Sequence, residues 1–360
     1  MSYTYNIDPK AMFEDRFKQF VSFGIPQADV EALQATITDM WADAPGGWPF
    51  EWSAGARKYL EAGNPLLASL AYGFAKFPCL ANEARRRALE NQLAAYLTAA
   101  PMFPVNFERR VIALPYQGGL VDLPVHLFSG SGRYDNKPVL LYSGGVDTYK
   151  MDSHLLVMTL ARRLAVTVLA FDMPGTAENP IPLSIQGDKL ILGLVKQARK
   201  LGNGTVIHFG LSFGGNFAAM TGLSGAVDAA VVLGGPVDKA YARENLERLP
   251  YGMPGIIGND MGFDQEPAFD EFTAAIGNFS RRALLDRSDN SPMIVINGAD
   301  DAFVPQADTL VFEGRRNTEV HLIPGTGHCA SSKLPEALDL ICNWLQMQTG
   351  SIAFRDSGGN

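Results

Sequence analysis

A serine between two glycines is the clearest sign of chemistry in this sequence. Ser212 lies at the centre of Gly210-Leu211-Ser212-Phe213-Gly214. A strand-like run, 205–209, leads into this pentapeptide, and a helix-like run, 216–221, leaves it. A nucleophile elbow needs this setting, because small residues two before and two after the serine let strand and helix pass closely. We therefore expect Ser212 to be a nucleophile; the alternative is a glycine-rich structural turn.

An acid and a base follow the serine in the chain order Ser, Asp, His. The buried-strand pattern at 292–297 leads to Asp300 and Asp301, and sites in open α/β sheets lie at such strand ends. We expect Asp301 to orient the base, because 302–305 completes an Asp-x-x-Val-Pro pattern associated with such an acid. Asp300 is the rival, and either carboxylate also suits the cap of the helix that follows.

His328 has the best context for a base among the 5 histidines. It follows the strand pattern 319–323 on a loop with Gly325 and Gly327, from which it can reach across the strand ends to Ser212. The other histidines fall in strand patterns or open a helix, where structural roles are favoured: His126, His208, His321 and His154. No pair of histidines has metal-ligand spacing with Cys, Asp or Glu, so we expect neither a metal nor another cofactor.

A glycine pair at the end of another strand pattern offers backbone donors. The run 138–143 opens into Gly144-Gly145-Val146. An amide from this loop, that of Val146 or Gly145, and the amide of Phe213 are our candidates for an oxyanion hole, which holds negative charge on a substrate oxygen. The alternative is that the glycines serve only a tight turn.

Composition restricts the class of protein. The chain has 360 residues, 47% of them hydrophobic, a net charge of −8 and a pI of about 5.2, which argues against nucleic-acid or anionic-membrane partners. Its 3 cysteines are too scattered for a disulfide framework, so we expect a reducing cytoplasm. Residues 1–20 are too charged for a signal peptide, and no apolar run is long enough to cross a bilayer. A small-molecule substrate is the expected partner, and a homodimer is compatible with the sequence.

The periodicity changes near residue 103. Helical spacing dominates residues 1–103, where we expect a cap or lid. Within it, a helix from Val30 to Trp41 should end at 45–47, and an aromatic loop with Trp48 and Trp52 should follow. Strand and helix patterns then alternate through 104–350, which indicates a mostly parallel sheet covered on both faces, with an excursion at 236–289 and a flexible tail at 351–360.

With these motifs identified, the region 107–347 resembles the α/β-hydrolase fold. The whole chain is similar to the subgroup that contains the fermentation-respiration switch protein, 2,6-dihydroxypseudooxynicotine hydrolase and fungal polyketide-shortening hydrolases, through its helical N-terminus and the run 144–150. The sequence departs from the familiar pattern at 172–179, which lacks the second glycine and the serine of an Asp-x-Pro-Gly-x-Gly-x-Ser turn, and at Met151, where an acid is expected.

The resemblance implies a serine hydrolase with Ser212, Asp301 and His328 as its triad. It would act on an ester, thioester or ketone (C–C) bond of a bulky, largely apolar small molecule, in secondary metabolism or catabolism. The same site also suits a lyase or cyclase that eliminates or closes a ring without net hydrolysis. A third hypothesis is a regulatory protein that keeps the fold without the chemistry.

Overall fold

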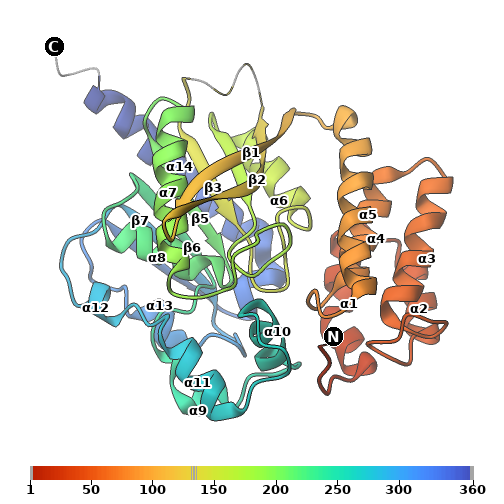
Figure 1. Cartoon of the computed structure of the whole chain (residues 1–360). Helices are drawn as coiled ribbons and strands as arrows, with labels where there is room; N and C mark the ends of the chain where they lie inside the picture. The colour runs from red at the N-terminus through yellow and green to blue at the C-terminus, as the bar shows by residue number, and fades with distance from the viewer. Residues whose placement is uncertain (1–2, 131, 133, 135, 357–360) are drawn as a thin grey trace.

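The protein is built on a mixed, mostly parallel sheet of eight strands in the order β1-β2-β4-β3-β5-β6-β7-β8 (Figure 1). The structure is a computed structural model and describes residues 3–130, 132, 134 and 136–356. The strands are β1 (Asn106–Tyr116), β2 (Gly119–Ser129), β3 (Val139–Ser143), β4 (Thr167–Phe171), β5 (Val206–Leu211), β6 (Ala229–Leu233), β7 (Met293–Gly298) and β8 (Thr318–Ile323). Strands β3 to β8 are parallel, whereas β2 runs antiparallel to both β1 and β4.

Strands β3 to β7 are buried on both faces, as their continuous apolar sequences predict, whereas the edge strand β8 is partly exposed. In β3, Val139 and Leu141 join one hydrophobic cluster, and Leu140 and Tyr142 join another on the opposite face. This alternation follows from the period of two along a strand. The sheet therefore separates two layers of core.

Helices cover both of these layers (Figure 1). The first is covered by α7 (Gly187–Leu201) and α8 (Gly214–Leu223), and the second by α6 (His154–Arg163) and α14 (Leu334–Asp356). The remaining elements after β7 are the short helix α13 (Gln306–Leu310) and the 3₁₀ segment η3 (His328–Lys333). The expected α/β-hydrolase fold, with a helical N-terminal region beside it, is confirmed.

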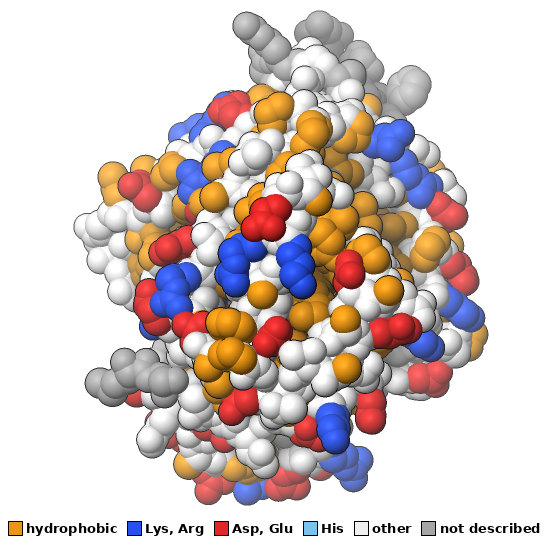
Figure 2. All heavy atoms as spheres, turned by 90° about the vertical axis from the view of Figure 1, so that its right-hand side faces the viewer, with side chains coloured by type: hydrophobic (Ala, Val, Ile, Leu, Met, Phe, Trp, Pro, Cys, Tyr) orange, Lys and Arg blue, Asp and Glu red, His pale blue; other side chains and the backbone are white. Residues whose placement is uncertain are grey.

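The N-terminal helices form a separate layer beside the sheet (Figure 1). They are α1 (Pro9–Ser22), α2 (Gln27–Thr36), α3 (Trp48–Glu61), α4 (Pro65–Lys76) and α5 (Glu83–Ala99), followed by η1 (Ala100–Met102). They bury an aromatic core of their own, in which Phe20 contacts Trp52 and Phe74 at ring-centroid distances of 5.2 and 4.6 Å. On the side of these helices, hydrophobic side chains are exposed among charged ones (Figure 2). We propose that residues 1–103 are a cap over the sheet domain.

Two expectations about these helices were wrong. Helix α2 ends at Thr36 rather than near Pro45, and Ile37 is already extended with φ −78° and ψ 122°. The β-branched run 36–38 has low helix propensity, which favours this early end. The predicted aromatic loop is instead the start of α3, because Pro49 suits a first helical turn and the buried Trp48 and Trp52 lie one turn apart.

The excursion between β6 and β7 consists of short helices beyond the carboxyl ends of the strands. These are η2 (Lys239–Tyr241), α9 (Arg243–Leu246), α10 (Met253–Asp260), α11 (Phe269–Gly277) and α12 (Arg282–Leu285). Helix α10 contacts the start of the chain, since the Tyr3 hydroxyl donates to the carbonyl of Gly255 at 2.7 Å. The side chain of Arg281 ties the excursion to α8 through Asn216 and to α7 through Asp188.

The C-terminal end of the chain is helical over most of its described length. Helix α14 continues to Asp356, so it includes the first part of the tail expected at 351–360, and residues 357–360 lie outside the described residues. In the described ranges, no helix is both long enough and apolar enough to cross a membrane.

Candidate active site

Ser212 occupies a sharp turn between β5 and α8. Its φ of 55° is in the left-handed region, where a non-glycine residue is strained. The turn is crowded: a Cβ on Gly210 would lie 2.1 Å from the carbonyl oxygen of Gly214, and one on Gly214 would lie 2.4 Å from that of Gly144. Only glycines permit this packing, so the spacing of the pentapeptide is explained by backbone contacts.

Two hydrogen bonds connect the three predicted side chains. His328 Nε2 lies 2.8 Å from Ser212 Oγ, and His328 Nδ1 lies 2.7 Å from Asp301 Oδ2. The Asp301 side chain is only 1% exposed, whereas Asp300 is exposed and uses its backbone amide to bind Thr326. The structure thus brings Ser212, His328 and Asp301 together and leaves Asp300 outside this chain of hydrogen bonds.

The charges of Asp301 and His328 stabilise each other. Burial disfavours the ionised form of Asp301, but the charge of His328 and hydrogen bonds from His328, Asn297 and the Phe303 amide lower its pKa. Burial also disfavours protonation of His328, but Cys329 and Asp301 raise its pKa well above the usual value of 6.5. The geometry therefore stabilises an imidazolium next to a carboxylate, the ion pair that forms when a histidine removes a proton from serine.

Asn297 is a site residue that the sequence did not reveal. It lies at the end of β7 and is 1% exposed. Its Oδ1 accepts from the amides of Gly298 and Cys329 at 2.9 and 3.0 Å, so it holds the turn on which His328 lies. The available signal was its position, one residue before the glycine that ends the strand.

The loop after β3 lies against the serine. A Cβ on Gly145 would lie 2.8 Å from Ser212 Oγ and 3.7 Å from the Phe213 amide nitrogen, and Gly214 N donates to Gly144 O at 3.1 Å. In the described part of the chain, the amides of Val146 and Phe213 donate to no protein acceptor. The loop expected to offer oxyanion donors is therefore adjacent to Ser212, with these two amides available to a ligand.

An ion-pair cluster surrounds the buried Lys150 at the turn 172–179. Lys150 Nζ binds Asp172 and also Glu178, the latter at 2.7 Å, and Arg109 binds Glu178 at 2.6 Å. The Lys150 amide also donates to Asp172 at 2.9 Å. Glu178 thus compensates the buried lysine in a turn that lacks the familiar glycine and serine.

One aromatic ring adjoins the histidine, and a second aromatic ring packs against the first. The Phe303 ring lies 5.2 Å from that of His328, and Tyr251 from the excursion lies 6.2 Å from Phe303. Both aromatic residues retain solvent exposure, so they are candidates for contact with an apolar ligand.

Three of the other histidines have structural surroundings, and the fourth, His321, lies in β8 at 3.6 Å from Glu319. His208 is fully buried and binds Thr221 at 2.9 Å, His154 binds Tyr96 at 2.9 Å, and the ring of His126 stacks on that of Tyr96. All three cysteines are buried and free. No cluster with the composition of a metal site occurs among the described residues.

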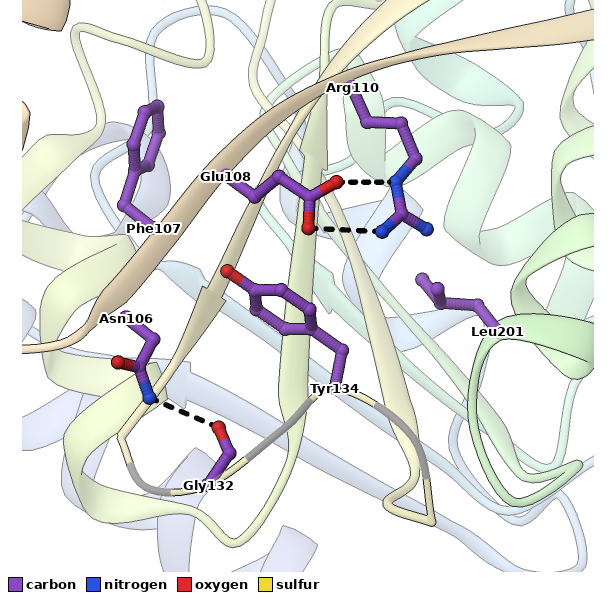
Figure 3. Close-up of a pocket in the computed structure, with 7 residues that line it drawn as sticks. All are labelled: Asn106, Phe107, Glu108, Arg110, Gly132, Tyr134 and Leu201. Carbon is purple, nitrogen blue, oxygen red and sulfur yellow. Dashed lines mark hydrogen bonds and ion pairs between the residues drawn. The ribbon is translucent and has the colours of Figure 1, made fainter.

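A separate hollow of about 700 Å³ lies at the end of the sheet opposite to Ser212, His328 and Asp301 (Figure 3). Its lining comes from the start of β1, the segment before β3 and the end of α7: Asn106, Phe107, Glu108, Arg110, Gly132, Tyr134 and Leu201. Glu108 is occupied by a bidentate pair with Arg110, at 2.7 and 3.0 Å. Because ligands of α/β sheets bind at the carboxyl ends of strands, this hollow is a poor candidate for the active site.

Comparisons with known proteins identify the family of this chain. A family model described as Esterase FrsA-like matches residues 41–349. Esterase FrsA of Vibrio cholerae serotype O1 is 24% identical over 370 residues, covering 91% of this chain and 86% of that protein. Esterase FrsA of Klebsiella pneumoniae is 25% identical over 287 residues, covering 73% of this chain and 68% of that protein.

Solved structures share the fold over nearly the whole chain. AbyA5 superposes with a TM-score of 0.79 at 20% identity, covering 93% of this chain and 94% of its own. The 2,6-dihydroxy-pseudo-oxynicotine hydrolase gives a TM-score of 0.71 at 18% identity, with coverage of 91% and 94%. At such low identities, these likenesses concern the fold alone.

Proposed function

Because this chain belongs to the Esterase FrsA-like family and is an α/β-hydrolase-type enzyme, we propose that it is a serine hydrolase whose nucleophile is Ser212. The observation that carries the proposal is the pair of hydrogen bonds from His328, 2.8 Å to Ser212 Oγ and 2.7 Å to Asp301 Oδ2. In this arrangement a serine hydroxyl is activated by a neutral imidazole that a carboxylate holds in the required tautomer.

The first half of the reaction forms an acyl-enzyme. Ser212 Oγ attacks the carbonyl carbon of an ester while its proton passes to His328 Nε2, and Asp301 stabilises the resulting imidazolium. The amides of Phe213 and Val146, or Gly145, donate to the oxyanion. His328 then protonates the leaving oxygen as the bond to it breaks.

The second half releases the acid. His328 takes a proton from water, the hydroxide attacks the acyl carbon, and the amides again hold the oxyanion. Collapse of this intermediate returns the proton to Ser212. Every step uses protein groups and water, so we expect full activity after treatment with a chelator.

The substrate we propose is a bulky, largely apolar small molecule with an ester, thioester or ketone (C–C) bond, met in catabolism or secondary metabolism. The family's esterases favour an ester first. The ring of Phe303 beside His328, with the ring of Tyr251 next to Phe303, suits an apolar or aromatic group beside the scissile bond. One structural neighbour is named as the hydrolase of a small organic compound, 2,6-dihydroxy-pseudo-oxynicotine.

Intact-mass analysis after treatment with a small fluorophosphonate tests the proposed nucleophile. We expect one adduct on the wild type and none on Ser212→Ala, with Ser224→Ala, on a serine at the end of α8, labelled like the wild type. No adduct on the wild type, under conditions that label a control serine esterase fully, would contradict the proposal and favour the regulatory hypothesis.

A second experiment separates hydrolysis from elimination or cyclisation. A panel of 4-nitrophenyl esters and thioesters of increasing acyl size identifies a substrate, and turnover in ¹⁸O-labelled water follows the fate of the oxygen. Incorporation of label into the acid product supports hydrolysis. An enzyme that labels with fluorophosphonate, hydrolyses none of the panel and forms unlabelled product from a ketone substrate would instead be a lyase or cyclase.

A further inference from the structure

The loop that carries Gly145 and Val146 is bound by the N-terminal helices through a buried carboxylate. Asp152 Oδ2 accepts from Lys76 Nζ at 2.6 Å and from the Tyr149 amide at 2.8 Å. Its Oδ1 accepts from Gln92 Nε2 at 2.7 Å. One carboxylate therefore joins the end of α4 and the middle of α5 to the turn that follows the candidate oxyanion donors.

The helix opposite this carboxylate is shaped to admit it. A Cβ on Gly73 of α4 would lie 2.5 Å from Asp152 Oδ1 and 2.7 Å from Gln92 Nε2. Real Cβ atoms do not approach polar atoms so closely, so a larger residue would displace Asp152 or Gln92. Glycine inside a helix costs up to about 1 kcal/mol relative to alanine, and here it allows the contact.

The ion pair between Lys76 and Asp152 carries a large desolvation penalty. Lys76 is 1% exposed and Asp152 9% exposed, and removing both charges from water costs several kcal/mol for each ion. Lys76 Nζ also lies 4.0 Å from the centroid of the Tyr149 ring, so the cation contacts the loop twice. What such a pair does supply is a fixed geometry, since its partners have defined directions.

A second contact reaches the same loop from α1. Arg16 binds Asp147 at 3.0 Å, and Asp147 directly follows Val146. On the core side, Lys150 is fixed by Asp172. The loop is thus held at 147 and 152 by the N-terminal helices and at 150 by the sheet domain.

We propose that Lys76 is a positioning residue that fixes the oxyanion loop through Asp152, so that the N-terminal helices complete the active site as well as cover it. This inference rests on the proposed function. It predicts that removal of the Lys76 ammonium lets the loop shift and misdirects the Val146 amide. A displacement of about 1 Å at a reacting centre lowers rates by up to about 100-fold.

The test compares Lys76→Met and Asp152→Asn with Lys58→Met, a matched control on an exposed lysine of α3. Fluorophosphonate labelling rates, kcat, KM and the inhibition constant of a trifluoromethyl ketone, which mimics the oxyanion, are measured for each. We expect Lys76→Met to lower the labelling rate and kcat by about 10- to 100-fold, with KM nearly unchanged. The inhibition constant of the trifluoromethyl ketone should rise by a similar factor. The control should match the wild type.

The double variant Lys76→Met/Asp152→Asn addresses misfolding, because replacing a buried pair as a unit is tolerated better than leaving one charge unpaired. We expect it to melt near the wild type while retaining the slow labelling. If the folded double variant and both single variants label at the wild-type rate, the inference is overturned and the proposed function stands. If the wild type itself does not label, both this inference and the proposed function are overturned.

Discussion

Asn297 Nδ2 donates to Asp301 Oδ2 at 2.8 Å, and that same oxygen receives the hydrogen bond from His328 Nδ1. With its other amide atom, Asn297 binds the backbone of Cys329, next to the histidine. One buried amide therefore orients the acid and fixes the turn that carries the base. Side chains that hold the groups contacting a reactive centre set its geometry as much as the reacting groups do.

We predict that Asn297→Ala lowers kcat/KM by about 10- to 100-fold, because a hydrogen bond to a charged group contributes about 1.5–3 kcal/mol. The pKa of Asp301 should rise as this donor is lost. Steady-state kinetics and thermal melting of the same samples check this, with Asn278→Ala at the exposed end of α11 as the control. A lower melting temperature with unchanged kcat/KM would show that Asn297 has a structural role only.

Replacing each of the two neighbouring aspartates by asparagine in turn separates their roles. Asp301→Asn should lower kcat by about 10⁴-fold, because an amide cannot hold the imidazole in the required tautomer or stabilise the imidazolium. Asp300→Asn should leave kcat within about threefold of the wild type, since Asp300 is exposed and contacts neither His328 nor Ser212 among the described residues. The reverse order of effects would assign the acid to Asp300.

The rate of ester hydrolysis should depend on the protonation of His328. The base works only when neutral, so kcat/KM is low at acid pH and rises as the imidazolium loses its proton. Because Cys329 and Asp301 outweigh burial and raise the pKa of His328 well above 6.5, the midpoint of this rise should lie above pH 6.5. A pH profile with an uncharged ester measures it. A midpoint at or below 6.5 contradicts the proposed electrostatics.

The candidate site was predictable from sequence where its residues belong to local motifs. Ser212 is marked by Gly210 and Gly214. Asp301 and His328 are each marked by the strand pattern that precedes them, 292–297 and 319–323. The residues after Asp301 favoured it over Asp300, and in the structure it is Asp301 that bonds to His328. The fold was also predictable from local sequence, because continuous apolar runs indicate parallel strands that are buried on both faces of a sheet.

Tertiary pairing accounts for what the sequence concealed. Lys76 and Asp152 lie 76 residues apart, and neither belongs to a recognisable pattern. Glu178 lies at a variable position of the turn 172–179, so the sequence pattern did not mark it as a partner of Lys150. The start of helix α3 was mistaken for a loop because its aromatic residues were counted as a cluster rather than as the buried face of a helix.

Asp260, at the end of α10, yields a prediction about stability. It is 2% exposed, and neither carboxyl oxygen has a hydrogen-bond partner among the described residues. Burial, with a smaller contribution from the charge of Asp147, raises its pKa well above 3.8, so the folded protein holds a proton that the unfolded chain releases. Stability from this group is therefore complete below the unfolded pKa and falls as pH rises toward the folded one, by about 1.4 kcal/mol per pH unit.

Asp260→Asn should remove this dependence, because an amide does not titrate. The difference in unfolding free energy, variant minus wild type, should increase as the pH rises above the ordinary pKa of an aspartate, since only the wild type loses stability from this group. Urea unfolding at a series of pH values measures the difference, and Asp264→Asn at an exposed position nearby provides the control. If the difference does not change with pH, Asp260 has an ordinary pKa in the folded protein and its carboxylate reaches water or a partner in solution.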